Sequence, residues 1–224
     1  VEHLFSAGCP LVIIACNTAS AKALRTIQQK DLPAIDSSRR VLGVIRPTAE
    51  AIGSMTKTRH VGILATQGAV NSQSYIMEIA KLHPDIKVTQ EACPMWVPLV
   101  ENGEFDGDGA DYFVEKYIDS LLGRDSEIDL IILGCTHYPL LMPKIRAFVP
   151  EKITVLNQGP VVAESLESYL KRHPGMESRI SRGGSRRYLT TETPEIFEHQ
   201  GSCFMSRAFK AERIEFADRT GAEK

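Results

Sequence analysis

The sequence lacks long hydrophobic runs, and this absence excludes a membrane-spanning helix. None of its apolar stretches approaches the roughly 18 residues that such a helix needs, and no secretory signal opens the sequence. A disulfide framework is lacking too, because the five cysteines are odd in number and widely scattered. Free cysteines are typical of a reducing compartment. We therefore expect a cytoplasmic protein with no membrane partner.

An excess of charge of either sign is also lacking. The 26 lysines and arginines are balanced by 28 aspartates and glutamates, so that nothing attracts the chain generally to nucleic acid. One basic stretch, residues 171–187, stands out. We interpret it as a solvated surface loop, and a patch that binds anions or nucleic acid is the alternative. Gly183-Gly184-Ser185 within it lacks the rest of a phosphate-binding Walker pattern.

Signals for strands and helices alternate along the chain. Its 224 residues, 43% of them apolar, suffice for one large or two small domains. Short apolar runs predict strands at residues 11–15, 41–45, 61–65, 87–92, 130–133, 153–156, 187–190 and 211–216. Helices are predicted at residues 20–29, 48–55, 71–82, 108–122, 140–148 and 161–170 and from residue 194, with a compact apolar turn at 94–100. Such alternation predicts parallel sheets with helices on both faces.

Two of the predicted strands end in the same arrangement. Each closes on a small residue, followed by a cysteine and then by polar side chains. The two sets are Cys16-Asn17-Thr18 and Cys135-Thr136-His137. The carboxyl ends of parallel strands form the ligand edge of an open α/β fold. Two buried cysteines without chemistry are the plain alternative, but the matching contexts favour a site with one thiol on each side of a substrate.

Two facing thiols can invert a stereocentre. A thiolate at the start of a helix is stabilised by free backbone N–H groups and by the helix dipole. One cysteine then removes a proton from a bound molecule while the other returns a proton from the far side, with no cofactor. Zinc ligation by Cys16, Cys135 and His137 is an alternative. It is disfavoured because no close ligand pair such as Cys-x-x-Cys occurs, so we expect no metal.

The two cysteine motifs resemble the signatures of bacterial glutamate racemases. These are A-C-N-T-A at residues 15–19 and G-C-T-H-Y-P-L at residues 134–140. Further similar stretches are V-G-I-L-A-T at 61–66, C-P-M-W-V-P-L-V-E-N-G at 93–103 and A-E-R-I-E-F at 211–216. The resemblance covers essentially the whole chain. Aspartate racemases carry a similar cysteine pair but typically place an acidic residue after the second C-T, so His137 favours the glutamate branch.

The resemblance implies roles for particular residues. Cys16 and Cys135 would be catalytic, with His137 as the proton partner of Cys135, and Glu101 lies near the position of an auxiliary acid. Substrate contacts would come from Asn17, Thr18, Thr66, Thr136 and His137. The implied reaction interconverts L-glutamate and D-glutamate without a cofactor, in a homodimer, and supplies D-glutamate for peptidoglycan. The family often has D-S-G where this chain has Asn157-Gln158-Gly159.

The opening segment is the largest departure from the family. Family members begin with a strand ending in D-S-G-x-G-G and continue to a P-Y-G motif, and this chain has neither. We expect two pseudo-symmetric parallel-sheet α/β domains with the active site between them. The first, residues 1–47 plus 149–224, would be incomplete at its N-terminus, and the second would span residues 48–148. The alternatives are a catalytically impaired member that acts only as a binding or interaction protein, and an aspartate-type racemase.

Overall fold

Parallel strands build the sheets of the protein. The computed structural model describes residues 1–216, and within them the strand orders are β1-β2, β4-β3-β5-β6 and β7-β8. Each neighbouring pair is parallel, as the sequence predicts for an α/β fold. The strands are β1 (Leu11–Ile14), β2 (Arg40–Gly43), β3 (His60–Ala65), β4 (Lys87–Ala92), β5 (Leu130–Gly134), β6 (Thr154–Asn157), β7 (Tyr188–Thr190) and β8 (Ala211–Arg213).

Helices connect these strands. The longer ones are α2 (Asn17–Thr26), α4 (Ile45–Ala51), α6 (Ser74–Leu82), α8 (Asp108–Arg124), α9 (Met142–Phe148), α10 (Gln158–Arg172) and α12 (Pro194–Met205). The shorter ones are α1 (Glu2–Ser6), α3 (Leu32–Ile35), α5 (Gln67–Ser72), α7 (Trp96–Glu101) and α11 (Pro174–Glu177). Single π or 3₁₀ turns are η1 (Ile27–Asp31), η2 (Ile52–Ser54) and η3 (Tyr138–Leu141). None of the helices in residues 1–216 is long and apolar enough to cross a membrane.

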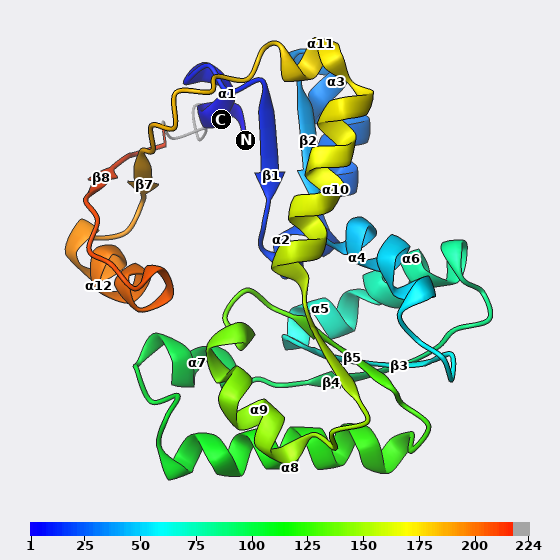
Figure 1. Ribbon diagram of the computed structural model, residues 1–224. Coiled ribbons are helices and arrows are strands. Elements are labelled where there is room, and N and C mark those ends of the chain that lie inside the picture. Colours follow the sequence, from blue (N-terminus) through cyan, green and yellow to red (C-terminus); the bar gives the residue numbers. More distant parts are fainter. Residues whose placement is uncertain (217–224) are drawn as a thin grey trace, which may run out of the picture. The chain divides into compact units, whose positions relative to one another are not determined.

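The four-stranded sheet is buried on both faces. In Figure 1, α8 and α9 lie on one side of it and α4, α5 and α6 on the other. Along β3, Ile63 and Ala65 enter the core with α4 and α6, whereas Leu64 enters the core with α8. Side chains of one strand alternate between the two faces, and a parallel sheet covered on both faces needs apolar residues at every position. This is why β3 and β5 are continuous apolar runs.

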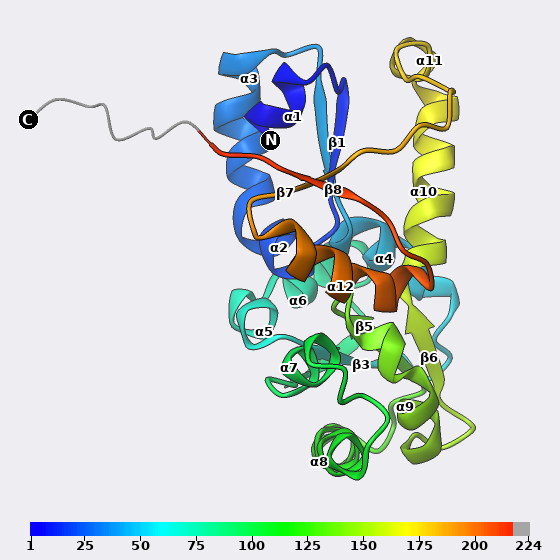
Figure 2. The same cartoon turned by 90° about the vertical axis from the view of Figure 1, so that its left-hand side faces the viewer.

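The two-stranded sheet has a smaller core. Phe5, Val12, Leu32 and Val41 form it, from α1, β1, α3 and β2. In both views α2 lies beside α5, which begins at the end of β3, and α10 packs against α4 (Figures 1 and 2). These contacts bring the end of β1 near the carboxyl edge of the larger sheet.

Several element boundaries differ from the prediction, and prolines account for two of them. The predicted turn at residues 94–100 contains helix α7, and α4 begins at Ile45, before Pro47. A proline in the first turn of a helix costs little, because the N–H group that it lacks has no partner within the helix there. The predicted helix over 71–82 is two helices, α5 and α6, which meet at Gln73 in a left-handed conformation (φ 55°).

Two compact units, Val1–Ile180 and Ser181–Lys224, emerge from the contacts within the chain. The sheet of the second predicted domain runs past its expected end at residue 148, because β6 pairs with β5. Val155 of β6 is buried in the same core as α8 and α9. The grouping of residues 1–47 with the C-terminal segment into one domain stays a prediction, and its residues 217–224 lie outside the described residues.

Candidate functional site

Cys135 lies at the carboxyl end of a central strand. It follows β5 directly, and all five strand residues are buried, because β5 is central in the sheet and its side chains enter the cores on both faces. The Cys135 side chain is itself buried, with the residue 9% exposed. Burial raises the pKa of the Cys135 thiol, which hydrogen bonds from the backbone N–H of His137 and from Thr136 partly offset. A negative charge on Cys16 raises this pKa further.

His137 connects this thiol to a carboxylate. Its Nδ1 atom is 3.7 Å from Cys135 Sγ, and its Nε2 atom is 3.0 Å from an oxygen of Glu101 at the end of α7. With Nε2–H donating to the carboxylate, the lone pair of Nδ1 faces the thiol. The resulting Cys135–His137–Glu101 chain is an arrangement in which a proton can move between sulfur and imidazole. Thr136 is exposed, and its hydroxyl is 3.4 Å from His137 Nδ1.

Cys16 occupies the N-cap of α2, just after β1. Its backbone is extended there (φ −68°, ψ 121°), and its carbonyl accepts the first hydrogen bond of the helix from the Ser20 N–H group. The side chain is exposed, in contrast to that of Cys135. The N–H groups in the first turn of a helix lack partners within the helix, so the region beside this thiol attracts negative charge.

Thr18 and Thr66 connect the segment that follows β1 to the segment that follows β3. Thr66 caps α5 after β3, and its Oγ1 atom is 2.7 Å from Oγ1 of Thr18 in α2. A β-carbon at Gly68 would lie 2.9 Å from the Thr18 methyl group, so glycine allows α5 to approach this closely. The structure therefore brings together two predicted substrate contacts from different sheets, and their hydroxyl groups form a polar pair beside Cys16.

Asn17 is turned differently from the other predicted contacts. It is 3% exposed, and its Oδ1 atom accepts a hydrogen bond of 2.5 Å from the Tyr75 hydroxyl. Gln158 in turn donates to Tyr75 and to Thr48. None of these three partners was predicted as part of the site. For Gln158 the sequence carried one signal, since this chain has Asn157-Gln158-Gly159 where the family often has D-S-G.

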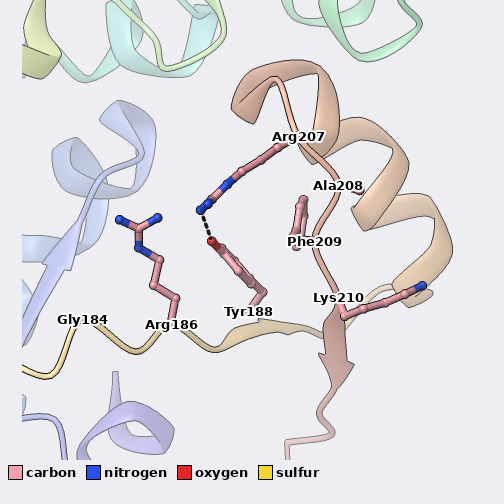
Figure 3. A pocket seen from close by; sticks show the side chains of 7 residues that line it. All are labelled: Gly184, Arg186, Tyr188, Arg207, Ala208, Phe209 and Lys210. Carbon is pink, nitrogen blue, oxygen red and sulfur yellow. Dashed lines mark hydrogen bonds between the residues drawn. The ribbon is translucent and has the colours of Figure 1, made fainter.

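A pocket lies in the C-terminal unit (Figure 3). Its volume is about 400 Å³, and it is lined by Gly184, Arg186, Tyr188, Arg207, Ala208, Phe209 and Lys210. Figure 3 shows Arg207 donating to the Tyr188 hydroxyl. The pocket contains none of the predicted site residues and no thiol. The nearby Arg187 of the basic stretch is paired with Glu212 at 2.7 Å on the surface.

A metal site finds no support among residues 1–216, since no group of three or more His, Cys, Asp or Glu side chains has a suitable arrangement there. The zinc alternative would need Cys16, Cys135 and His137 to converge on one point. His137 instead lies between Cys135 and Glu101. A thiol in contact with an imidazole is an arrangement that can take part in proton transfer.

Known proteins with similar sequences are racemases. The family model described as Asp/Glu/Hydantoin racemase matches residues 1–166, which include both thiols. A glutamate racemase of Roseobacter denitrificans is 37% identical over 97% of this chain and 79% of its own length. One of Paracoccus denitrificans is 36% identical, over 95% and 79%.

Solved structures give the same result at the level of the fold. A glutamate racemase isoform from Bacillus anthracis matches with a TM-score of 0.84 and 29% identity, over 96% of this chain and 77% of its own. A glutamate racemase from Francisella tularensis, solved in complex with D-glutamate, matches with a TM-score of 0.79 and 25% identity, over 97% and 76%. The fold and the family model define an isomerase of the racemase class. Within this class, the chain belongs to the glutamate racemase family.

Proposed function

We propose that this protein interconverts L-glutamate and D-glutamate by proton transfer between Cys16, Cys135 and the α-carbon of the substrate. The observation that carries the proposal is the position of the two thiols, each just after the carboxyl end of a strand, with Thr18 of the Cys16 motif hydrogen-bonded to Thr66 at the end of β3, the strand beside β5. The names of the relatives, and the D-glutamate bound to the one from Francisella tularensis, support glutamate as the substrate.

The reaction needs one thiolate and one thiol. The thiolate removes the α-proton of glutamate, and the electron pair of the broken C–H bond stays on the substrate as a carbanion. The thiol on the opposite face then gives its proton to the α-carbon, so that the configuration is inverted. Each turnover leaves the first sulfur protonated and the second as thiolate. The resemblance assigns the α-proton of D-glutamate to Cys16 and that of L-glutamate to Cys135.

The residues around the two thiols contribute to proton transfer or to substrate binding. Through its contacts with Cys135 and Glu101, His137 takes up and returns the Cys135 proton. Glu101 acts as the auxiliary acid, at the end of the Cys135–His137–Glu101 row that lies away from Cys135. The carboxylates of glutamate bind to hydroxyl and amide groups of Asn17, Thr18, Thr66 and Thr136, beside the N-terminus of α2. Hydrogen bonds of this kind to a charged group are stronger than those between neutral groups.

The biological setting belongs to the same proposal and rests on the family resemblance. D-glutamate made by this protein would be used for peptidoglycan in the cytoplasm, and the active form would be a homodimer. Size-exclusion chromatography with light scattering measures the oligomeric state directly. A monomer at all concentrations that support activity would remove the dimer from the proposal.

A racemisation assay tests the function. The purified protein is incubated with L-glutamate in D₂O, and the loss of the α-proton is followed by NMR together with optical rotation. We expect D-glutamate to accumulate to an equal mixture, with deuterium at the α-carbon. L-Aspartate is the matched control substrate. Turnover of aspartate in preference to glutamate would favour the aspartate-type alternative. The absence of deuterium exchange into either amino acid would favour the alternative of a binding or interaction protein without catalysis.

The pH dependence of exchange follows from the burial of Cys135. Because burial raises the pKa of this thiol, its basic form becomes more abundant as the pH rises past the ordinary thiol value of about 8.5. We expect deuterium exchange into L-glutamate, the step begun by Cys135, to keep rising between pH 7 and pH 9 at saturating substrate. NMR at a series of pH values measures the rate. A plateau that begins below pH 8 would contradict a raised pKa.

A further inference from the structure

Four buried polar side chains form a continuous hydrogen-bonded row behind Cys16. Gln158 Nε2 lies 2.8 Å from Thr48 Oγ1 and 2.6 Å from the Tyr75 hydroxyl, which lies 2.5 Å from Asn17 Oδ1. Their exposed fractions are 7% for Gln158, 0% for Thr48 and Tyr75, and 3% for Asn17. The row crosses from α10 through α6 to the first residue of α2, next to a catalytic thiol. We call it the Gln158 relay.

Each hydrogen bond of the Gln158 relay has a fixed donor, and the bonds run outward from Gln158, to Thr48 on one side and through Tyr75 to Asn17 on the other. The Thr48 hydroxyl donates to the Val44 carbonyl at 2.9 Å, so its lone pair is left to accept from Gln158. The Gln158 amide nitrogen is only a donor, so Tyr75 accepts from it and donates its own hydroxyl proton onward to Asn17. Burial raises the pKa of Tyr75, which keeps this donor protonated.

The direction of the hydrogen bond from Tyr75 to Asn17 decides which end of the Asn17 amide faces the site. With Oδ1 held by Tyr75, the N–H₂ group of Asn17 is directed away from the relay. That group has no hydrogen-bond partner among the described residues. An amide that is free to flip presents either its oxygen or its nitrogen, because the two ends have nearly the same shape. A fixed amide presents donors only, and donors are what a carboxylate requires.

Tyr75 also contacts the second half of the site. A β-carbon at Gly134 would lie 3.4 Å from Cε2 of the Tyr75 ring, so that glycine leaves room for the ring beside the residue that precedes Cys135. The charge of Cys135 affects the pKa of Tyr75, raising it in addition to burial. One side chain therefore lies against both strand ends that carry a thiol.

We propose that Tyr75 and Gln158 are positioning residues that hold the Asn17 amide with its N–H₂ group toward the substrate, as a donor to a carboxylate of glutamate. This inference rests on the proposed function. It adds to that function that the Gln158 relay contributes to binding of the substrate carboxylate, whereas the thiols carry out proton transfer. Loss of the relay then weakens substrate binding and leaves the chemical step at saturating substrate nearly unchanged.

Tyr75→Phe tests the proposal, because it removes only the hydroxyl that holds Asn17. We expect KM for both enantiomers of glutamate to rise about 10- to 100-fold, the effect of losing one hydrogen bond to a charged group. We expect kcat to change less than about 3-fold, since no thiol is touched. Gln158→Met keeps the side-chain volume but removes the donor, and we expect it to raise KM as well. This second variant keeps the test decisive if Tyr75→Phe folds poorly.

Tyr138→Phe is the matched control. Tyr138 is also fully buried, and its hydroxyl donates to the Cys93 carbonyl at 3.2 Å, outside the Gln158 relay. A general effect of removing a buried tyrosine hydroxyl would lower the melting temperature in both variants. Only Tyr75→Phe is expected to raise KM as well.

A double-mutant cycle with Asn17→Ala identifies the route of the effect. If Tyr75 acts through Asn17, then Tyr75→Phe adds no further increase in KM once Asn17 is alanine. Full additivity, or an unchanged KM in Tyr75→Phe beside an active wild-type protein, overturns this inference and leaves the proposed function standing. A wild-type protein that does not racemise glutamate overturns both.

Discussion

Replacement of either Cys16 or Cys135 by alanine is expected to abolish racemisation, lowering kcat/KM by about 10⁴-fold or more. In the proposed mechanism, each direction of the reaction needs one sulfur as base and the other as acid, so a single remaining thiol completes neither direction. The size is at the upper end of what one positioned acid–base group contributes. Optical rotation with L-glutamate and with D-glutamate measures both directions.

Two other cysteines provide controls of matching exposure. Cys203 on α12 is exposed, as Cys16 is, and Cys93 is buried, as Cys135 is. Cys203→Ala and Cys93→Ala are expected to retain racemisation, although Cys93→Ala leaves a small cavity in the core of the larger sheet. Near-normal turnover in Cys16→Ala or Cys135→Ala would refute the two-thiol mechanism, even if the protein proved to be a racemase.

Serine in place of one cysteine separates the two half-reactions. A serine hydroxyl is too weak an acid to ionise to the base that removes the α-proton. The remaining cysteine still removes the α-proton of its own enantiomer. We therefore expect Cys16→Ser to retain deuterium exchange into L-glutamate with little inversion, and Cys135→Ser to show the same for D-glutamate. Exchange into the opposite enantiomer in each variant would reverse the assignment of the two thiols.

The thiol-bearing strand ends were predictable because the signal is local. A short apolar run predicts a buried strand, and the polar residues that follow it must lie at the sheet edge whatever the rest of the chain does. The same holds for Thr66 after β3, which the structure places against Thr18. The α/β fold follows from the same alternation of strands and helices, and the structure confirms it.

The Gln158 relay was not predictable in this way. Its hydrogen bonds join residues 83 and 110 positions apart in the chain, so no local pattern contains them. Gln158 by itself reads as an ordinary polar residue at the start of a helix, and only packing of α10 against α4 buries it beside Thr48. The contact between Glu101 and His137 was not predictable for a related reason, because the two residues are 36 positions apart. The segment predicted as a turn at residues 94–100 contains α7, and Glu101 lies at the end of this helix.

His137→Asn is expected to slow proton transfer at Cys135 by about 10²- to 10⁴-fold and to affect Cys16 much less. His137 contacts Cys135 and Glu101, so its loss removes the group that we propose takes up and returns the Cys135 proton. Asparagine keeps a polar side chain of similar reach to Cys135 but has no titratable nitrogen. The loss should therefore be unequal between the two exchange reactions, larger for L-glutamate than for D-glutamate.

Deuterium exchange at the α-carbon, measured from each enantiomer separately and extrapolated to the earliest time points, gives the two rates. Glu101→Gln is the graded companion variant, because it keeps a hydrogen bond to His137 Nε2 and removes only the negative charge that stabilises the imidazolium. We expect it to slow the same reaction in the same direction but by less than His137→Asn. Equal losses in both exchange rates, with a raised KM, would assign His137 to substrate binding alone and would leave Cys135 to exchange its proton with other groups of the site.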